Sequence, residues 1–98
     1  LMATITGRLR AAHHDTGPGA FPALAAAMHE NRQLWSAFAT DLADSGNQFP
    51  RDLRARLFYL AEFVSQHTDK ALSGMAPADV LVDINLAVMR GLRPQGGH

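Results

Sequence analysis

The sequence predicts an all-α fold, a small bundle of about four helices, and three observations support this. Apolar residues recur three or four positions apart in four segments, which places them on one face of an α-helix in each. Glycine and proline, which interrupt helices, gather between those segments. The connections are short, which favours antiparallel neighbours.

Length and composition limit the possible functions. The 98 residues make a single helical domain, 1–98. Nine basic and nine acidic side chains cancel, and the basic face that nucleic-acid binders carry is not visible. No apolar run approaches the roughly 20 residues of a membrane span, and no signal peptide is visible. Without cysteine, disulfides, Cys-based zinc sites and thiol nucleophiles are excluded, which suits a reducing cytosol.

The first helix is predicted over residues 1–14, where an amphipathic stripe is weakened by Gly7. This stripe is already running at Leu1, and the chain does not begin with Met, so we expect further residues upstream. A loop follows at residues 15–19 (DTGPG), because two glycines surround a proline there.

The second helix is predicted from Phe21 to Asp44, with Pro22 in its first turn, where a missing N–H costs nothing. Gly46 then suits a left-handed residue that ends the helix. The stripe of this helix is assigned to the core and consists of Leu24, Met28, Asn31, Trp35, Phe38 and Leu42.

The third helix is the centre of the predicted bundle and runs from Pro50 to Leu72. Its apolar stripe is broad, so we expect partners on more than one side of it. Asn47 is a candidate N-terminal cap. The stripe is assigned to the core and consists of Leu53, Leu57, Leu60, Val64 and His67.

The fourth helix is predicted to begin at Pro77 and to end near Gly91, and residues 93–98 form a disordered tail. This helix is apolar on two sides. One face is assigned to the core and contains Ile84, Val88 and Leu92. The nearly opposite face contains Val82, Leu86 and Met89.

The second apolar face has two interpretations. Residues upstream of the chain, or another helix, could cover it, or it could form a groove that binds a partner helix. The partner interpretation places contacts at Phe58, Val82, Asn85, Leu86 and Met89. It predicts that replacing Val82 and Met89 together by Glu leaves the domain folded and abolishes partner binding.

No catalytic, cofactor-binding or metal-ligating constellation is recognisable in the sequence. His13 and His14 are adjacent and point about 100° apart on a helix, so they cannot converge on a metal that needs several ligands. His67 lies on an apolar stripe, which favours a packed histidine that donates to a neighbour. The acidic and serine side chains are dispersed, with no nucleophile elbow and no phosphate-binding loop, so we expect no enzyme.

Polar residues inside the predicted helices are expected to bond between helices in satisfied sets, because an unpaired buried amide or charge costs about 1–3 kcal/mol. These residues are Asn31, Asp41, Arg54, Asp83 and Asn85. Asn85 lies between the two apolar faces of its helix, so it is the best candidate among them for direct contact with a ligand.

Four stretches in order carry a family signal: NRQLWSAFATDLAD (31–44), N-x-x-P-x-x-LRA (47–55), FVSQH (63–67) and LVDINLAVMRGL (81–92). Within them, the matching residues are Asn31, Trp35, Asp41, Asn47, Pro50, Leu53, Arg54, Val64, His67, Asp83, Ile84, Asn85, Met89, Gly91 and Leu92. This set resembles the FlaF family of bacterial flagellar biosynthesis regulators. Each fragment alone is weak evidence of this resemblance, but the set of fragments in this order is specific to the family.

The resemblance implies a non-enzymatic cytoplasmic protein needed for flagellin production and export. FlaF-type proteins bind flagellin in a role similar to that of secretion chaperones, and they act alongside FlbT, a regulator linked to flagellin messenger RNA. The terminal segments of flagellin are amphipathic helices, which a cytosolic monomer must shield. We therefore expect a flagellin-binding chaperone and export adaptor, with flagellin helices and FlbT as candidate partners and no membrane or cofactor.

Two other functions remain open. The second apolar face could pair with its own copy in a structural homodimer. The chain could also regulate translation by acting on flagellin messenger RNA together with FlbT, although its neutral charge argues against direct contact with RNA.

Overall fold

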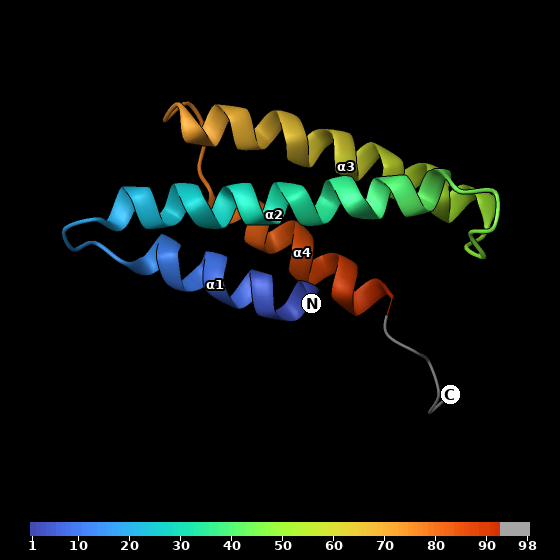
Figure 1. Cartoon of the computed structure of the whole chain (residues 1–98), viewed down its shortest axis with the longest axis horizontal. Coiled ribbons are helices and arrows are strands. Elements are labelled where there is room, and N and C mark those ends of the chain that lie inside the picture. The colour runs from blue at the N-terminus through green and yellow to red at the C-terminus, as the bar shows by residue number, and fades with distance from the viewer. Residues whose placement is uncertain (93–98) are drawn as a thin grey trace.

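The computed structural model describes residues 1–92, and all four of its regular elements are α-helices, which confirms the predicted all-α class. The predicted tail at 93–98 lies outside the described residues. The helices are α1 (Met2–His14), α2 (Ala20–Ala43), α3 (Arg51–Leu72) and α4 (Asp79–Gly91). Figure 1 shows α2 between α1 and α3, with α4 crossing behind them.

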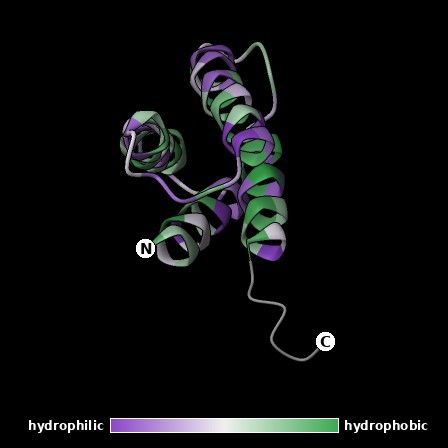
Figure 2. Ribbon diagram, turned by 90° about the vertical axis from the view of Figure 1, so that its right-hand side faces the viewer, coloured by the Kyte–Doolittle hydropathy of each residue, from purple (hydrophilic) through white to green (hydrophobic). Residues whose placement is uncertain are grey.

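The four helices do not pack equally against one another. Helix α2 packs along α1 and along α3, and α4 packs against α1 but makes only sparse contact with α3. Figure 2 looks roughly along the helices and shows α1 and α2 on one side, with α3 and α4 on the other. The sparse contact between α3 and α4 leaves the bundle least closed along that edge.

The core is built from side chains of all four helices. The largest fully buried apolar ones are Leu9, Met28, Trp35, Leu42, Val64 and Leu81. Leu57 and Val88 are buried as well. The other apolar residues that the sequence assigns to the core are only half-buried and pack at its margin, namely Leu24, Phe38, Leu53, Leu60, Ile84 and Leu92.

The turn after α2 differs from the predicted one. Gly46 does not adopt a left-handed conformation, because the glycines with positive φ among the described residues are Gly19 and Gly74. Instead the Gly46 N–H donates to the carboxylate of Asp44 over 3.0 Å. A side-chain acceptor therefore makes this turn, and the glycine is not needed for a positive φ.

The sequence predicts Asn47 as the N-terminal cap of α3, and this prediction is wrong. Its Oδ1 accepts from the N–H of Phe49 over 2.9 Å, and its Nδ2 donates to the backbone carbonyl of Asp41 over 3.2 Å. The residue at the N-cap position of α3 is Pro50, which provides no side-chain hydrogen bond. Asn47 thus fixes the α2–α3 connection, not the first turn of α3.

His67 holds the loop between α3 and α4. Its Nε2 lies 2.7 Å from the carbonyl oxygen of Pro77, so this nitrogen donates to it, as expected for a packed histidine with a neighbouring acceptor. The imidazole also stacks on Phe63, with ring centroids 5.4 Å apart. This contact positions the start of α4 relative to the end of α3.

Replacing His67 by Phe should keep the stacked ring and remove the hydrogen bond to Pro77. We expect the free energy of unfolding to fall by about 1 kcal/mol, the usual net contribution of one hydrogen bond. Urea unfolding followed by circular dichroism measures this. An unchanged midpoint would show that the bond to Pro77 does not stabilise the domain.

Candidate docking surface

The structure places two of the five predicted partner-contact residues inside the fold. Val82 is 6% exposed and Asn85 is 0% exposed, so the expectation that they face a partner is wrong. The reason is that α1 packs against α4 on the side that the sequence left free. For Val82, the alternative interpretation, cover by another helix of the domain, is the correct one.

Asn85 is the centre of a buried polar network that joins three helices. Its Oδ1 accepts from Trp35 Nε1 over 2.8 Å, and its Nδ2 donates to Asn31 Oδ1 over 2.7 Å and to Thr6 Oγ1 over 3.1 Å. Thr6 in turn donates to the carbonyl of Met2 over 2.7 Å. Asn85 therefore has a structural role, which corrects its choice as the polar residue most suited to ligand contact.

One donor in this network has no partner. Asn31 is fully buried, and its Nδ2 forms no hydrogen bond, although its Oδ1 accepts from Asn85. An unsatisfied buried donor costs about 1–3 kcal/mol. The network therefore fixes the position of α4 at some cost in stability.

The other three predicted contact residues lie on different surfaces. Phe58 is 41% exposed and lines a cleft between α2 and α3. Leu86 is half-buried beside the end of α1, near His13 and His14. Met89 is half-buried on the side of α4 that faces α2. The five residues therefore do not form a single docking surface.

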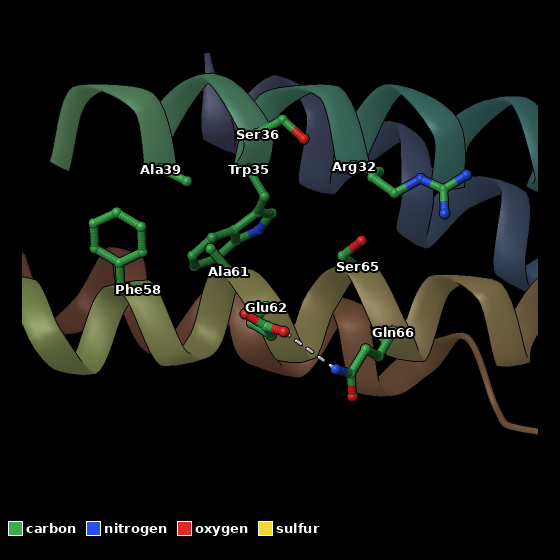
Figure 3. A pocket seen from close by; sticks show the side chains of 9 residues that line it. All are labelled: Arg32, Trp35, Ser36, Ala39, Phe58, Ala61, Glu62, Ser65 and Gln66. Carbon is green, nitrogen blue, oxygen red and sulfur yellow. Dashed lines mark hydrogen bonds between the residues drawn. The ribbon is translucent and has the colours of Figure 1, made fainter. Parts of the chain in front are cut away.

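The cleft beside Phe58 has a volume of about 330 Å³ and walls of mixed polarity. Figure 3 shows Trp35 and Phe58 between the two helices, with Ser36 on one wall and Glu62 and Gln66 on the other. Gln66 donates to Glu62 over 3.4 Å, as the dashed line marks. Nothing in this arrangement selects a particular ligand.

A more apolar hollow lies between α3 and α4, where these helices are in sparse contact. We call it the α3–α4 groove; it has a volume of about 270 Å³. Its lining consists of Leu53, Arg56, Leu57, Leu60, Ile84, Ala87, Val88, Gly91 and Leu92. The sequence assigned most of these residues to the core, and they form both the edge of the core and the wall of an open groove.

A second apolar hollow lies on the other side of α4 and has a volume of about 430 Å³. We call it the α2–α4 groove. Its lining consists of Leu1, Met2, Leu34, Ala37, Phe38, Asp41, Val88, Met89 and Leu92. Met89 is the member of the predicted contact set that reaches this groove.

The described residues offer no obvious place for metal chemistry. Among residues 1–92, no three His, Asp or Glu side chains gather closely enough to hold an ion. The ion pairs in this part of the chain, Arg8–Glu30 and Arg32–Asp69, join neighbouring helices at the surface. None of the described helices is long and apolar enough to cross a membrane.

Comparison with known proteins decides the family. A family model described as flagellar protein FlaF matches residues 1–92, all of the described chain. The chain belongs to the FlaF family. This confirms the resemblance found in the sequence and makes the chain a flagellar protein. Curated proteins and solved structures gave no match.

The FlaF likeness rests partly on residues that now have a clear structural role. Asn31, Trp35 and Asn85 belong to the buried network, and His67 holds the loop before α4. In this chain these residues have structural roles, and they do not line either of the two apolar grooves. Leu53, Ile84 and Leu92, which also carry the likeness, line the α3–α4 groove.

Proposed function

We propose that this FlaF-family chain is a flagellin-binding chaperone and export adaptor that also regulates flagellin synthesis. It holds an amphipathic helix of flagellin in the α3–α4 groove and so shields the apolar stripe of that helix before secretion. The observation that carries the proposal is an apolar groove between two sparsely packed helices in a chain of a flagellar family.

The shape and lining of the α3–α4 groove suit a helix. Leu53, Leu57 and Leu60 are spaced three or four residues apart, so they form a row along one wall. Ile84 and Val88 on α4 form a second row on the other wall. An amphipathic helix docks into such a groove by inserting side chains at the same i, i+3, i+4 and i+7 spacing.

The affinity needed for this role is moderate. An ordinary specific interface buries about 800 Å² on each partner. Several half-buried apolar side chains, Leu53, Leu60, Ile84 and Leu92, gain further burial when a helix covers the groove. Export requires release of flagellin, so a complex that forms readily and dissociates readily serves the function better than a very tight one.

Placing a charge in the α3–α4 groove tests this function. Ala87 is exposed and lines the groove, so Ala87→Glu should leave the core unchanged and put a carboxylate where an apolar stripe must dock. We expect flagellin binding, measured by isothermal titration, to weaken about tenfold or more, about 1.4 kcal/mol. Ala55→Glu is the matched control, because Ala55 is an exposed alanine of α3 outside the groove.

Other results would favour other functions. Absence of any binding between the unaltered chain and flagellin would refute the chaperone role. A molecular mass by light scattering that rises with concentration and falls in Ala87→Glu would identify a homodimer. Binding to flagellin messenger RNA that weakens steeply with salt would identify a regulator that contacts RNA directly.

A further inference from the structure

The end of α4 is a ridge between two apolar grooves. Val88 and Leu92 line both the α3–α4 groove and the α2–α4 groove. The α3–α4 groove runs along α4 from Ile84 to Leu92, a length of about 12 Å at 1.5 Å per residue, and the α2–α4 groove runs along α2 from Leu34 to Asp41, about 10 Å. Each groove therefore offers room for about two turns of a docked helix.

The two grooves differ in the charge at their edges. Arg56 is the charged residue in the lining of the α3–α4 groove, and Asp41 is the one in the lining of the α2–α4 groove. Both side chains are exposed, and neither belongs to an ion pair within residues 1–92. The first groove thus favours an acidic residue beside an apolar stripe, and the second favours a basic one.

Residues 93–98, RPQGGH, do not suit either groove. They contain no Leu, Ile, Val, Met, Phe, Tyr or Trp that could replace the contacts of an apolar stripe. The opposite charges at the two edges also distinguish the grooves from each other. A helix whose charge complements the edge of one groove therefore does not complement the edge of the other.

We propose that the two grooves bind two amphipathic segments of the same flagellin molecule, one on each side of the α4 ridge. The segment in the α3–α4 groove carries an acidic residue that faces Arg56, and the segment in the α2–α4 groove carries a basic residue that faces Asp41. This inference rests on the proposed function and deepens it by giving the site a second half.

Binding at two adjacent grooves has a specific advantage for a chaperone. Once one segment is bound, the second binds as an intramolecular step at a high effective concentration. Two individually weak contacts then give a higher overall affinity for flagellin. Each contact can still open alone, so the client can be released one segment at a time.

Replacing one alanine by glutamate in each groove separates the contributions of the two grooves to binding. Ala87 lines the α3–α4 groove and Ala37 lines the α2–α4 groove, and both are exposed helical residues. The titrants are intact flagellin and its N-terminal and C-terminal helical segments as separate peptides. Ala87→Glu should weaken one peptide about tenfold or more and leave the other unchanged, and Ala37→Glu should do the opposite. Both variants should weaken intact flagellin, and Ala55→Glu should weaken nothing.

Charge reversal at the edges tests the assignment of the segments. Arg56→Glu should weaken the peptide that Ala87→Glu weakens, and Asp41→Arg should weaken the peptide that Ala37→Glu weakens. Each effect should shrink at high salt, because exposed charges are screened.

Several outcomes would overturn the inference and leave the proposed function intact. If Ala37→Glu changes no affinity while Ala87→Glu does, flagellin uses one groove. If both variants weaken the same peptide, the grooves form one site for one segment. If Ala37→Glu converts a dimer to a monomer in light scattering, a second copy of the chain occupies the α2–α4 groove. Failure of the unaltered chain to bind intact flagellin would instead refute the proposed function itself.

Discussion

Replacing Asn85 by Leu is expected to cause the largest loss of stability of any single polar substitution in this chain. The substitution leaves the buried indole N–H of Trp35 and the buried amide oxygen of Asn31 without partners. Each orphaned group costs about 1–3 kcal/mol, so we expect the free energy of unfolding to fall by about 2–6 kcal/mol. Urea unfolding followed by circular dichroism measures the loss.

A double-mutant cycle with Trp35→Phe shows whether the network is the cause. Trp35→Phe removes the donor that Asn85 accepts from, so the two substitutions share one hydrogen bond and their effects should not add. Additive effects would mean that Asn85→Leu destabilises the domain through packing alone. The half-buried Asn47 side chain forms no part of the network, so Asn47 offers a control asparagine in the α2–α3 turn.

Val82→Glu alone is expected to destabilise the domain by about 2–4 kcal/mol, because the carboxylate would enter the buried contact between α1 and α4. This expectation reverses the one drawn from the sequence, in which a Val82 and Met89 double variant stays folded. The free energy of unfolding and the helical circular dichroism signal at 37 °C both report the change.

Met89→Glu is the control for Val82→Glu. Met89 is half-buried at the edge of the α2–α4 groove, where a carboxylate can reach water, so we expect a loss of about 1 kcal/mol or less. Equal losses in the two variants would contradict the packing of α4 described above. A Val82→Glu variant as stable as the unaltered chain would show that α1 does not cover this face in solution.

The helices themselves could be predicted from the sequence because local signals agree with the fold. The 3.6-residue periodicity, Pro50 before α3 and the glycine at Gly74 after it all specify helix boundaries without tertiary information. The predicted second helix, 21–44, differs by a single residue at each end from α2, Ala20–Ala43. The two wrong local predictions, a left-handed Gly46 and an Asn47 cap, both lie in the turn after α2. There the side chains of Asp44 and Asn47 accept hydrogen bonds from the turn's own backbone N–H groups.

The orientation of α4 could not be predicted, because both of its faces are apolar. Periodicity shows that α4 has two apolar faces. Which of these faces α1 buries depends on where α1 lies in the folded bundle. Asn85 was misjudged for the same reason. A polar residue between two apolar faces is a surface residue in one orientation and the centre of a core network in the other, and the contact with Thr6 at the start of the chain decides between them.

The α3–α4 groove was missed because apolar spacing does not distinguish a closed core from an open one. Leu53, Leu60 and Ile84 have the spacing of core residues, and they do pack at the core margin. The groove arises because α3 and α4 are in sparse contact, and that depends on how α4 is held by its packing on α1 and by the hydrogen bonds of Asn85 to α2. A groove of this kind is a property of the assembled bundle.

The bond from Asn85 to Thr6 joins residues 79 positions apart, so the first and last helices meet only when the whole chain has closed on itself. The α2–α3 hairpin has a short connection and can form early, whereas this closure carries the entropy cost of a long loop. Both grooves border α4, so neither exists until that late step is complete. Under the proposed function, a nascent or partly folded copy therefore cannot hold a flagellin helix, and binding begins only after the chain has folded completely.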